Sequence, residues 1–284
     1  MSHVEGPSGA LQSYVDKWLA VQPRQRIALV FVDAKRYPSH IALAALEQEW
    51  LSAAYGIQEP QVAAAKLNWW AEELSGAAAS GGRHPLTQVL FDDDHAHALP
   101  SERWLAPVLA AMAQLEEGTA ADFASQVAAA SELHGALAAL ETAWWYGDGA
   151  SSERAGRVAT LSHLLYALLR LEQDAERDRL PLPMARMARF GLSRGDLRKP
   201  GVAREQAIRA QLEDLLAAWR ESEQMTGPLS VFRELESQGS RGLVKRASKA
   251  GDPLAVLREG QAESGLGVAW QAWRAARAWR QLAG

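Results

Sequence analysis

The chain has 284 residues, of which 54 are Ala and 37 are Leu, whereas Val, Ile and Thr together number only 24. Ala and Leu lose little on entering a helix, and strands favour β-branched and aromatic side chains, so the composition predicts an all-α fold. The absence of cysteine excludes disulfides, zinc ribbons, iron–sulfur clusters and thiol catalysis, and a formal net charge of −4 gives no reason to expect a nucleic-acid partner.

Proline and glycine divide the first half of the chain into helical segments. Pro38, Pro60 and Pro85 each stand near a predicted helix start, where the missing N–H of proline costs nothing. Stretches rich in Gly, Ala and Ser, and stretches of polar residues, predict loops. We expect helices at 8–21, 24–35, 38–54, 60–74, 84–91 and about 104–117, with loops at 75–83 and 92–100.

The second half of the chain begins with two long segments that have the composition of core helices. Leu180-Pro-Leu-Pro183 then forms a firm stop, because two closely spaced prolines cannot lie inside a helix. No repeat and no low-complexity linker divides the sequence, so we expect a single domain over 1–284 with its core at about 24–282. The helices expected here are 120–147, 154–177, 184–189, 204–222, 228–236, 241–249 and 266–282.

The C-terminal part of the chain is basic. From Ser240 to Gly284 there are eight Lys/Arg residues and three acidic residues, a local charge of +5. A solvated helix face is the simplest interpretation, and a patch that meets anionic lipid or a diphosphate is the alternative. No apolar run approaches the roughly 18 residues needed to span a bilayer, and the N-terminus lacks the features of a signal peptide. We therefore expect a cytoplasmic protein, with peripheral membrane association left open.

Two conspicuous features have ordinary explanations. Asp92-Asp-Asp-His-Ala-His97 contains five potential metal ligands, but its flanks predict a mobile surface loop without the rigid support that a metal site needs. The tryptophans at Trp69-Trp70, Trp144-Trp145 and near the C-terminus lie on apolar helical faces, where core packing explains them. A wall for a long apolar ligand is the alternative for these tryptophans.

An acidic stretch precedes the proline stop. Glu172 and Glu176, and likewise Asp174 and Asp178, are spaced so that each pair lies on one face of a helix. Two carboxylates placed in this way can hold a Mg²⁺ ion that bridges to phosphate oxygens. Three arginines are interleaved with these acids, so a self-paired, solvated helix end is the competing interpretation; they are Arg170, Arg177 and Arg179.

Several motifs together resemble one family. Glu59-Pro60 leads to Lys66-Leu-Asn-Trp-Trp-Ala-Glu-Glu73 and then to His84-Pro85, and Gly135 lies within a small-residue helix. Gln173-Asp-Ala-Glu-Arg-Asp-Arg-Leu-Pro-Leu-Pro183 follows, with Arg189-Phe-Gly-Leu192 after it. In order and spacing these segments resemble the squalene/phytoene synthase family over nearly the whole chain.

The resemblance implies an isoprenoid-synthase-like helical bundle with a central cavity for prenyl chains. Active members condense two prenyl diphosphates head to head, and Mg²⁺ held by two aspartate-rich helices draws off the diphosphate. Carried over to this sequence, the resemblance implies substrate binding by six residues and weak metal ligation by three. The substrate-binding residues are Lys66, Trp69, Trp70, Arg170, Asp174 and Asp178, and the metal ligands are Glu47, Asp174 and Asp178.

The sequence departs from the family pattern at both aspartate-rich motifs. The helix before Glu59-Pro60 has no aspartate, and Glu47 and Glu49 lie two positions apart, about 200° around a helix, so they cannot hold one ion together. In the second motif, Arg170 stands where the partner of Asp174 belongs, and a cation there repels Mg²⁺ although it can contact a phosphate directly. These departures predict the loss of ordinary Mg²⁺-dependent condensation.

Three functions remain open at this stage. The first is a catalytically degenerate member that binds a prenyl or lipid-like ligand or acts as an accessory or assembly factor with a protein partner. The second is a divergent prenyltransferase that acts on farnesyl or geranylgeranyl diphosphate and uses Mg²⁺. The third is a helical interaction protein without a small-molecule site. The predicted presence of a cavity distinguishes the first two from the third.

Overall fold

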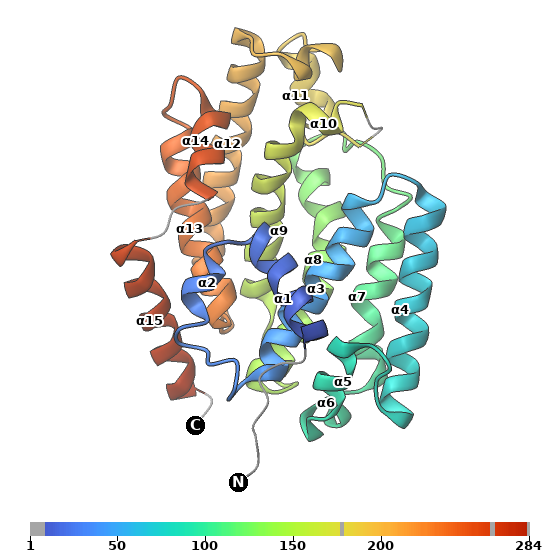
Figure 1. Ribbon diagram of the computed structural model, residues 1–284. Helices are drawn as coiled ribbons and strands as arrows, with labels where there is room; N and C mark the ends of the chain where they lie inside the picture. Colours follow the sequence, from blue (N-terminus) through green and yellow to red (C-terminus); the bar gives the residue numbers. More distant parts are fainter. Residues whose placement is uncertain (1–8, 177–178, 262–264, 283–284) are drawn as a thin grey trace.

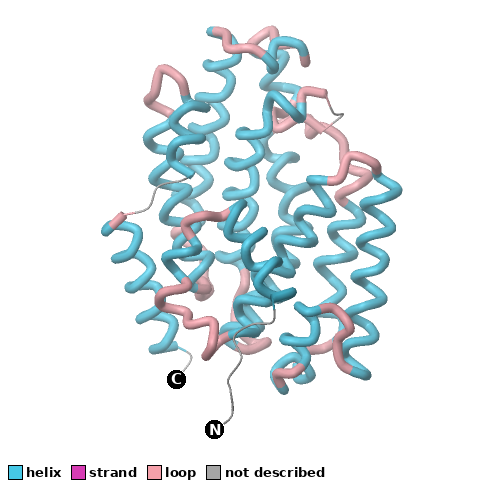
Figure 2. Tube along the Cα trace, viewed as in Figure 1, coloured by secondary structure: helices cyan, strands magenta, loops and turns pink. Residues whose placement is uncertain are grey.

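The computed structural model describes residues 9–176, 179–261 and 265–282, and within these ranges every regular element is a helix (Figures 1 and 2). This confirms the predicted all-α class. None of the described helices combines the length and apolar character required to cross a membrane. The helices are α1 (Gly9–Val21), α2 (Gln25–Ala28), α3 (Pro38–Gly56), α4 (Pro60–Ser80), α5 (Pro85–Phe91), α6 (Asp94–Ala98), α7 (Ser101–Ala113), α8 (Phe123–Tyr146), α9 (Glu153–Ala167), α10 (Leu171–Asp174), α11 (Met184–Arg189), α12 (Val202–Ser222), α13 (Val231–Ala247), α14 (Pro253–Gln261) and α15 (Leu266–Leu282), with 3₁₀ turns at η1 (Leu168–Arg170) and η2 (Gly195–Arg198).

Local sequence explains where the long helices begin and end. Proline occupies the first turn of α3, α4 and α5, as expected from its fixed φ and missing N–H. Asp122 and Ser125 form a reciprocal capping box that starts α8. Gly81 after α4 and Gly147 after α8 have φ values of 82° and 89°, a backbone geometry that glycine adopts at no steric cost.

Helices α8 and α9 form the centre of the bundle, with α3, α4 and α7 on one side and α12, α13 and α14 on the other (Figure 1). Two glycines let the central pair approach closely: a Cβ atom added to Gly156 would lie 3.4 Å from the Cα of Gly135. The Gly135 position singled out by the family resemblance therefore serves helix packing. Buried residues occur on several faces of α8, because neighbouring helices surround it.

The tryptophans divide into buried and exposed groups. Trp18, Trp50, Trp70, Trp104 and Trp219 are among the largest fully buried side chains, so core packing accounts for them. Trp69, Trp270 and Trp273 instead keep 40%, 57% and 37% of their surface exposed. The expectation that all of them pack on apolar faces of the core is thus wrong for these three.

Several predicted element boundaries were wrong. The segment expected as a helix at 24–35 contains only the short α2 followed by turns, α4 continues through the expected loop to Ser80, and α6 lies inside the expected loop at 92–100. The two helices expected at 228–236 and 241–249 are one helix, α13. Within α13, Gly239 leaves space for the side chain of Arg24, which a Cβ atom at this position would meet.

The helix predicted at 154–177 is also interrupted. α9 ends at Ala167, the chain tightens into η1, and α10 ends at Asp174. At Arg170 the backbone leaves helical geometry, with φ −98° and ψ 9°. Asp178, which was predicted to share a helical face with Asp174, lies outside the described residues, and the described backbone is already in a turn at Ala175 and Glu176.

Candidate ligand cavity

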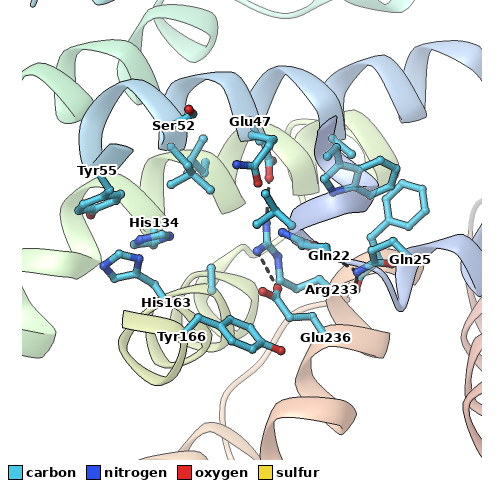
Figure 3. A pocket seen from close by; sticks show the side chains of 18 of the residues that line it. Gln22, Gln25, Glu47, Ser52, Tyr55, His134, His163, Tyr166, Arg233 and Glu236 are labelled. Carbon is cyan, nitrogen blue, oxygen red and sulfur yellow. Dashed lines mark hydrogen bonds and ion pairs between the residues drawn. The ribbon is translucent and has the colours of Figure 1, made fainter. Parts of the chain in front are cut away.

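A cavity of about 360 Å³ lies between α3, α8, α9 and α13, and the segment around α2 also contributes to its lining. Its walls include the apolar side chains of Trp18, Leu51, Leu137 and Phe232. Figure 3 shows the polar side chains gathered in two groups, one around Arg233 and the other around Tyr55. The cavity is thus an apolar space with a charged region and an aromatic region.

The charged region is a buried cluster that joins three helices. The guanidinium of Arg233 on α13 donates to Glu141 of α8 at 2.9 Å, to Glu236 of its own helix at 3.0 Å and to Glu47 of α3 at 3.2 Å. Ser230 donates its hydroxyl to Glu141. These contacts link α13 to α3 and α8 across the cavity.

One guanidinium faces three buried carboxyl groups, and burial opposes the ionisation of two of them, Glu47 and Glu236. Burial, and then the neighbouring charge of Glu141, raises the pKa of Glu47 to about 8. Burial also raises the pKa of Glu236, against the attraction of Arg233. Glu47 is thus already paired with Arg233, and burial opposes its ionisation, so it is a poor ligand for a second cation.

This arrangement predicts a measurable pH dependence of stability. The folded-state pKa of Glu47 lies above the ordinary value of 4.5, so its contribution is present below about pH 4.5 and is lost as the pH rises toward about 8. Glu47→Gln keeps a neutral acceptor for Arg233, and we expect its free energy of unfolding to fall less between pH 5 and 8 than that of the wild type. Urea denaturation across this range measures the difference. Parallel curves for the two proteins would contradict the assignment.

The aromatic region consists of Tyr55, His134 and His163. The rings of Tyr55 and His163 have centroids 4.3 Å apart, and those of His134 and His163 are 4.4 Å apart. Burial lowers the pKa of His134 to about 3 and that of His163 well below its ordinary value, so both imidazoles are neutral at pH 7. Burial likewise raises the pKa of Tyr55, so its hydroxyl keeps its proton.

Arginines lie beside this aromatic group. The guanidiniums of Arg170 and Arg179 are 6.0 and 5.5 Å from the centre of the Tyr55 ring. Arg170 also contacts Asp174 at 3.4 Å. A second, smaller cavity of about 70 Å³ is lined by Asp174 and Arg179, and it shares Tyr55, His163 and Arg170 with the larger one. The two spaces therefore meet at a wall that is aromatic and cationic.

Comparison with known proteins bears on this cavity. The squalene/phytoene synthase family model matches residues 27–233. The chain belongs to the squalene/phytoene synthase family. This confirms the resemblance drawn from the motifs. No curated protein sequence matches the chain significantly.

Two solved structures share the fold. The squalene synthase HpnC from Alicyclobacillus acidocaldarius is 15% identical, with a TM-score of 0.57 over 94% of this chain and 95% of that one. A dehydrosqualene synthase in complex with ligand is 10% identical, with a TM-score of 0.64 over 96% of this chain and 99% of that one. At these identities the likeness shows the isoprenoid-synthase architecture that the resemblance implied.

The residues predicted for the site are not brought together at one place. Glu47 lines the larger cavity, Asp174 lines the smaller one, and Arg170 lines both. Trp69 and Trp70 pack edge-on against the His84 ring. Lys66 pairs with Glu49 at 2.7 Å. These last three predicted substrate-binding residues, Lys66, Trp69 and Trp70, are not among the lining residues of either cavity, and Asp178 is outside the described part of the chain.

Glu73, the acidic residue that ends the Trp-Trp motif, has a structural role. The carboxylate of Glu73 accepts from the backbone N–H groups of Arg83 and His84 at 2.6 and 2.9 Å. It also accepts from the Arg83 guanidinium at 2.9 Å and from the Thr87 hydroxyl at 2.6 Å. Glu73 thereby joins α4 to the start of α5, which explains why the motif and the later His-Pro pair occur together.

The acidic loop at 92–97 is likewise accounted for by local structure. Asp93 caps α6 by accepting from the N–H of His95, and it also accepts from Ser39 at 2.9 Å. The His95 ring packs edge-on against Trp144, and His97 contacts the carbonyl oxygen of Phe91 at 3.0 Å. Asp93, His95 and His97 therefore each contact other parts of the fold.

The donor set around the larger cavity does not fit the Mg²⁺ that active family members use. Mg²⁺ prefers ionised carboxylate oxygens. The side chains that α3 presents to this cavity include Gln48, Ser52 and Tyr55 beside Glu47, which is bound to Arg233. Among the residues that the structure describes, no group of three or more His, Asp or Glu side chains is arranged to hold a metal ion.

Sequence reasoning missed the residues that dominate the cavity. His134 and Glu141 lie on one helix, whereas His163 and Arg233 come from two others, and none of the four was predicted as a site residue. A weak signal was present, because His134 and Glu141 interrupt an otherwise Ala/Leu-rich helix. Buried polar residues of this kind require partners, and the partners come from other helices.

Proposed function

We propose that this member of the squalene/phytoene synthase family binds an elongated apolar ligand with an anionic head, of the prenyl diphosphate class, without ordinary Mg²⁺-dependent condensation. One observation carries the proposal. Of the two carboxylates on the helix that corresponds to the first aspartate-rich motif, Glu47 is bound to Arg233 and Glu49 is bound to Lys66. Neither carboxylate is available for a metal ion in the way the family chemistry requires.

The walls of the cavity support such a ligand. The apolar side chains of Leu51, Leu137 and Phe232 suit a hydrocarbon chain, and Arg170 stands at the boundary of the two spaces with 40% of its side chain exposed. A guanidinium can bind phosphate oxygens directly and bidentately, without an intervening cation. In this scheme Arg170 exchanges its contact with Asp174 for a contact with the ligand.

Ligand binding should therefore be independent of Mg²⁺. We expect farnesyl or geranylgeranyl diphosphate to raise the melting temperature of the purified protein by a few degrees, equally with Mg²⁺ and with EDTA. A ligand at about 100 times its dissociation constant stabilises by about 2.7 kcal/mol, which is measurable by thermal shift. Arg170→Gln should lose most of the shift, whereas the matched exposed control Arg220→Gln should retain it.

A divergent prenyltransferase is the second candidate, because both solved structures named above are synthases of this family. The same samples distinguish the two functions when pyrophosphate release is followed in parallel. Mg²⁺-dependent release that is abolished by Asp174→Ala would establish the transferase and overturn the proposal. The absence of both thermal shift and release would instead leave an interaction protein without a small-molecule site.

A further inference from the structure

The C-terminal helix α15 has two faces with different properties. Its inner face consists of Ala272, Ala275, Ala276 and Trp279, which are buried. This face packs against α2 and α13, at the edge of the bundle (Figure 1). Small alanines allow close approach, and Trp279 packs its ring against Tyr37 with centroids 4.8 Å apart. The inner face is sufficient to hold α15 on the bundle.

The opposite face is apolar and aromatic but exposed. At about 100° per residue, Leu266, Trp270, Trp273 and Arg277 fall on one stripe, centred about 140° around the helix from the buried residues. Leu266 is 92% exposed, and the two tryptophans are the exposed ones noted above. Their rings stack with centroids 4.8 Å apart, and the Arg277 guanidinium lies 5.5 Å from the centre of the Trp273 ring. Nothing within the described bundle covers this stripe.

The charge of α15 indicates which kind of partner covers the exposed stripe. The helix carries Arg274, Arg277 and Arg280 and no acidic residue. Arg280 donates to the carbonyl oxygen of Phe31 at 2.8 Å, whereas Arg274 and Arg277 are exposed on or beside the stripe. A second copy of the chain would bring these like charges together, so self-association through this face is disfavoured.

We propose that α15 docks the protein on an anionic lipid surface through the stripe of Leu266, Trp270, Trp273 and Arg277. Tryptophan prefers the boundary between headgroups and acyl chains, where the ring is partly buried and its N–H stays hydrated. Arginine beside it binds the lipid phosphates, and its charge is attracted by an anionic leaflet. A helix lying in the plane of the interface needs one such face and no span across the bilayer.

The position of α15 connects this surface with the cavity. Gln261, the last residue of α14, lines the larger cavity shortly before α15 begins. Gln25, the first residue of α2, lines it as well, and α2 packs against α15. A bilayer bound to α15 would therefore lie close to elements that enclose the cavity. The docking proposal stands on the exposed stripe alone and does not require a ligand in the cavity.

Flotation with lipid vesicles tests the proposal. We expect the full-length protein to bind vesicles of phosphatidylcholine mixed with phosphatidylglycerol, to bind pure phosphatidylcholine at least about tenfold more weakly, and to dissociate at high salt. Trp270→Ser combined with Trp273→Ser should weaken binding by about tenfold or more, as should Arg274→Gln combined with Arg277→Gln.

Matched controls are available on the exposed surface elsewhere. Val202→Ser removes an apolar side chain that is 78% exposed, and Lys199→Gln combined with Arg220→Gln removes two exposed positive charges. These variants should bind vesicles as the wild type does, and circular dichroism with urea denaturation should show that all variants are folded. Equal binding of stripe variants and wild type, or no preference for anionic vesicles, would overturn the proposal. A solution dimer that the tryptophan substitutions dissociate would also overturn it, in favour of a protein interface.

Discussion

Arg233→Met is expected to lower the free energy of unfolding by about 3–5 kcal/mol, the range found when one partner of a buried ion pair is removed. The substitution keeps much of the side-chain volume but leaves Glu47, Glu141 and Glu236 without their shared cation. Because these carboxylates belong to α3, α8 and α13, the loss is expected to loosen the contacts across the cavity. Urea denaturation at pH 7 measures the change, with the transition midpoint and slope compared to wild type.

Two further variants make this prediction specific. Arg241→Met removes a half-exposed arginine from the same helix, one that pairs with Glu223, and it should cost less than about 1 kcal/mol. Adding Glu47→Gln and Glu141→Gln to Arg233→Met removes two of the stranded carboxylates and should recover a substantial part of the lost stability. If Arg233→Met and Arg241→Met destabilise equally, the buried cluster does not have the energetic role assigned to it.

Glu73→Gln is expected to cost about 3 kcal/mol, since hydrogen bonds to a charged group contribute roughly 1.5–3 kcal/mol each and the amide can replace only some of them. The glutamine side chain has an NH₂ donor where the glutamate has an acceptor oxygen. This NH₂ group would face another donor, whose hydrogen bond is therefore lost. Hydrogen bonds from Thr87, His84 and Arg83 outweigh burial and lower the pKa of Glu73 to about 2. The stabilisation is therefore fully present above the ordinary value of 4.5 and is lost as the pH falls toward about 2.

The acid unfolding curve tests this assignment. Wild type should lose stability between pH 4.5 and 2, whereas Glu73→Gln should be less stable at pH 7 and show a smaller further loss over that range. Glu72→Gln is the matched control, because the neighbouring Glu72 is exposed on the same helix. The assignment fails if Glu72→Gln and Glu73→Gln give the same stability at pH 7.

These two predictions separate the structural from the ligand-related parts of the family pattern. Glu73 belongs to one of the motifs that together resemble the family, and its hydrogen bonds make that motif a joint between α4 and α5. The cavity depends instead on Arg233, Tyr55 and His163, which belong to none of the motifs that marked the family. In this chain Glu73 joins two helices of the bundle, whereas Arg170 and Asp174 of the acidic stretch line the cavities beside residues that were not predicted.

The helical class and the family followed from the sequence because they depend on local properties. Composition predicts helices, and the helix starts at Pro38, Pro60 and Pro85 were predicted from the proline positions. The predicted division into helices at 228–236 and 241–249 was wrong, because these residues form one helix, α13. Gly239 within α13 leaves room for the Arg24 side chain, a contact between distant segments that the local pattern does not show.

The character of the cavity was decided by tertiary structure. The sequence by itself determined that the helix before Glu59-Pro60 contains no aspartate and that Arg170 lies four positions before Asp174, since both are properties of identity and order. It could not determine that Glu47 meets Arg233, because the two residues are separated by most of the chain and only the folding of α3 and α13 around one cavity brings them to 3.2 Å. Burial of the cluster then changes its protonation, a property that depends on the surroundings of a carboxylate rather than on its position in a sequence.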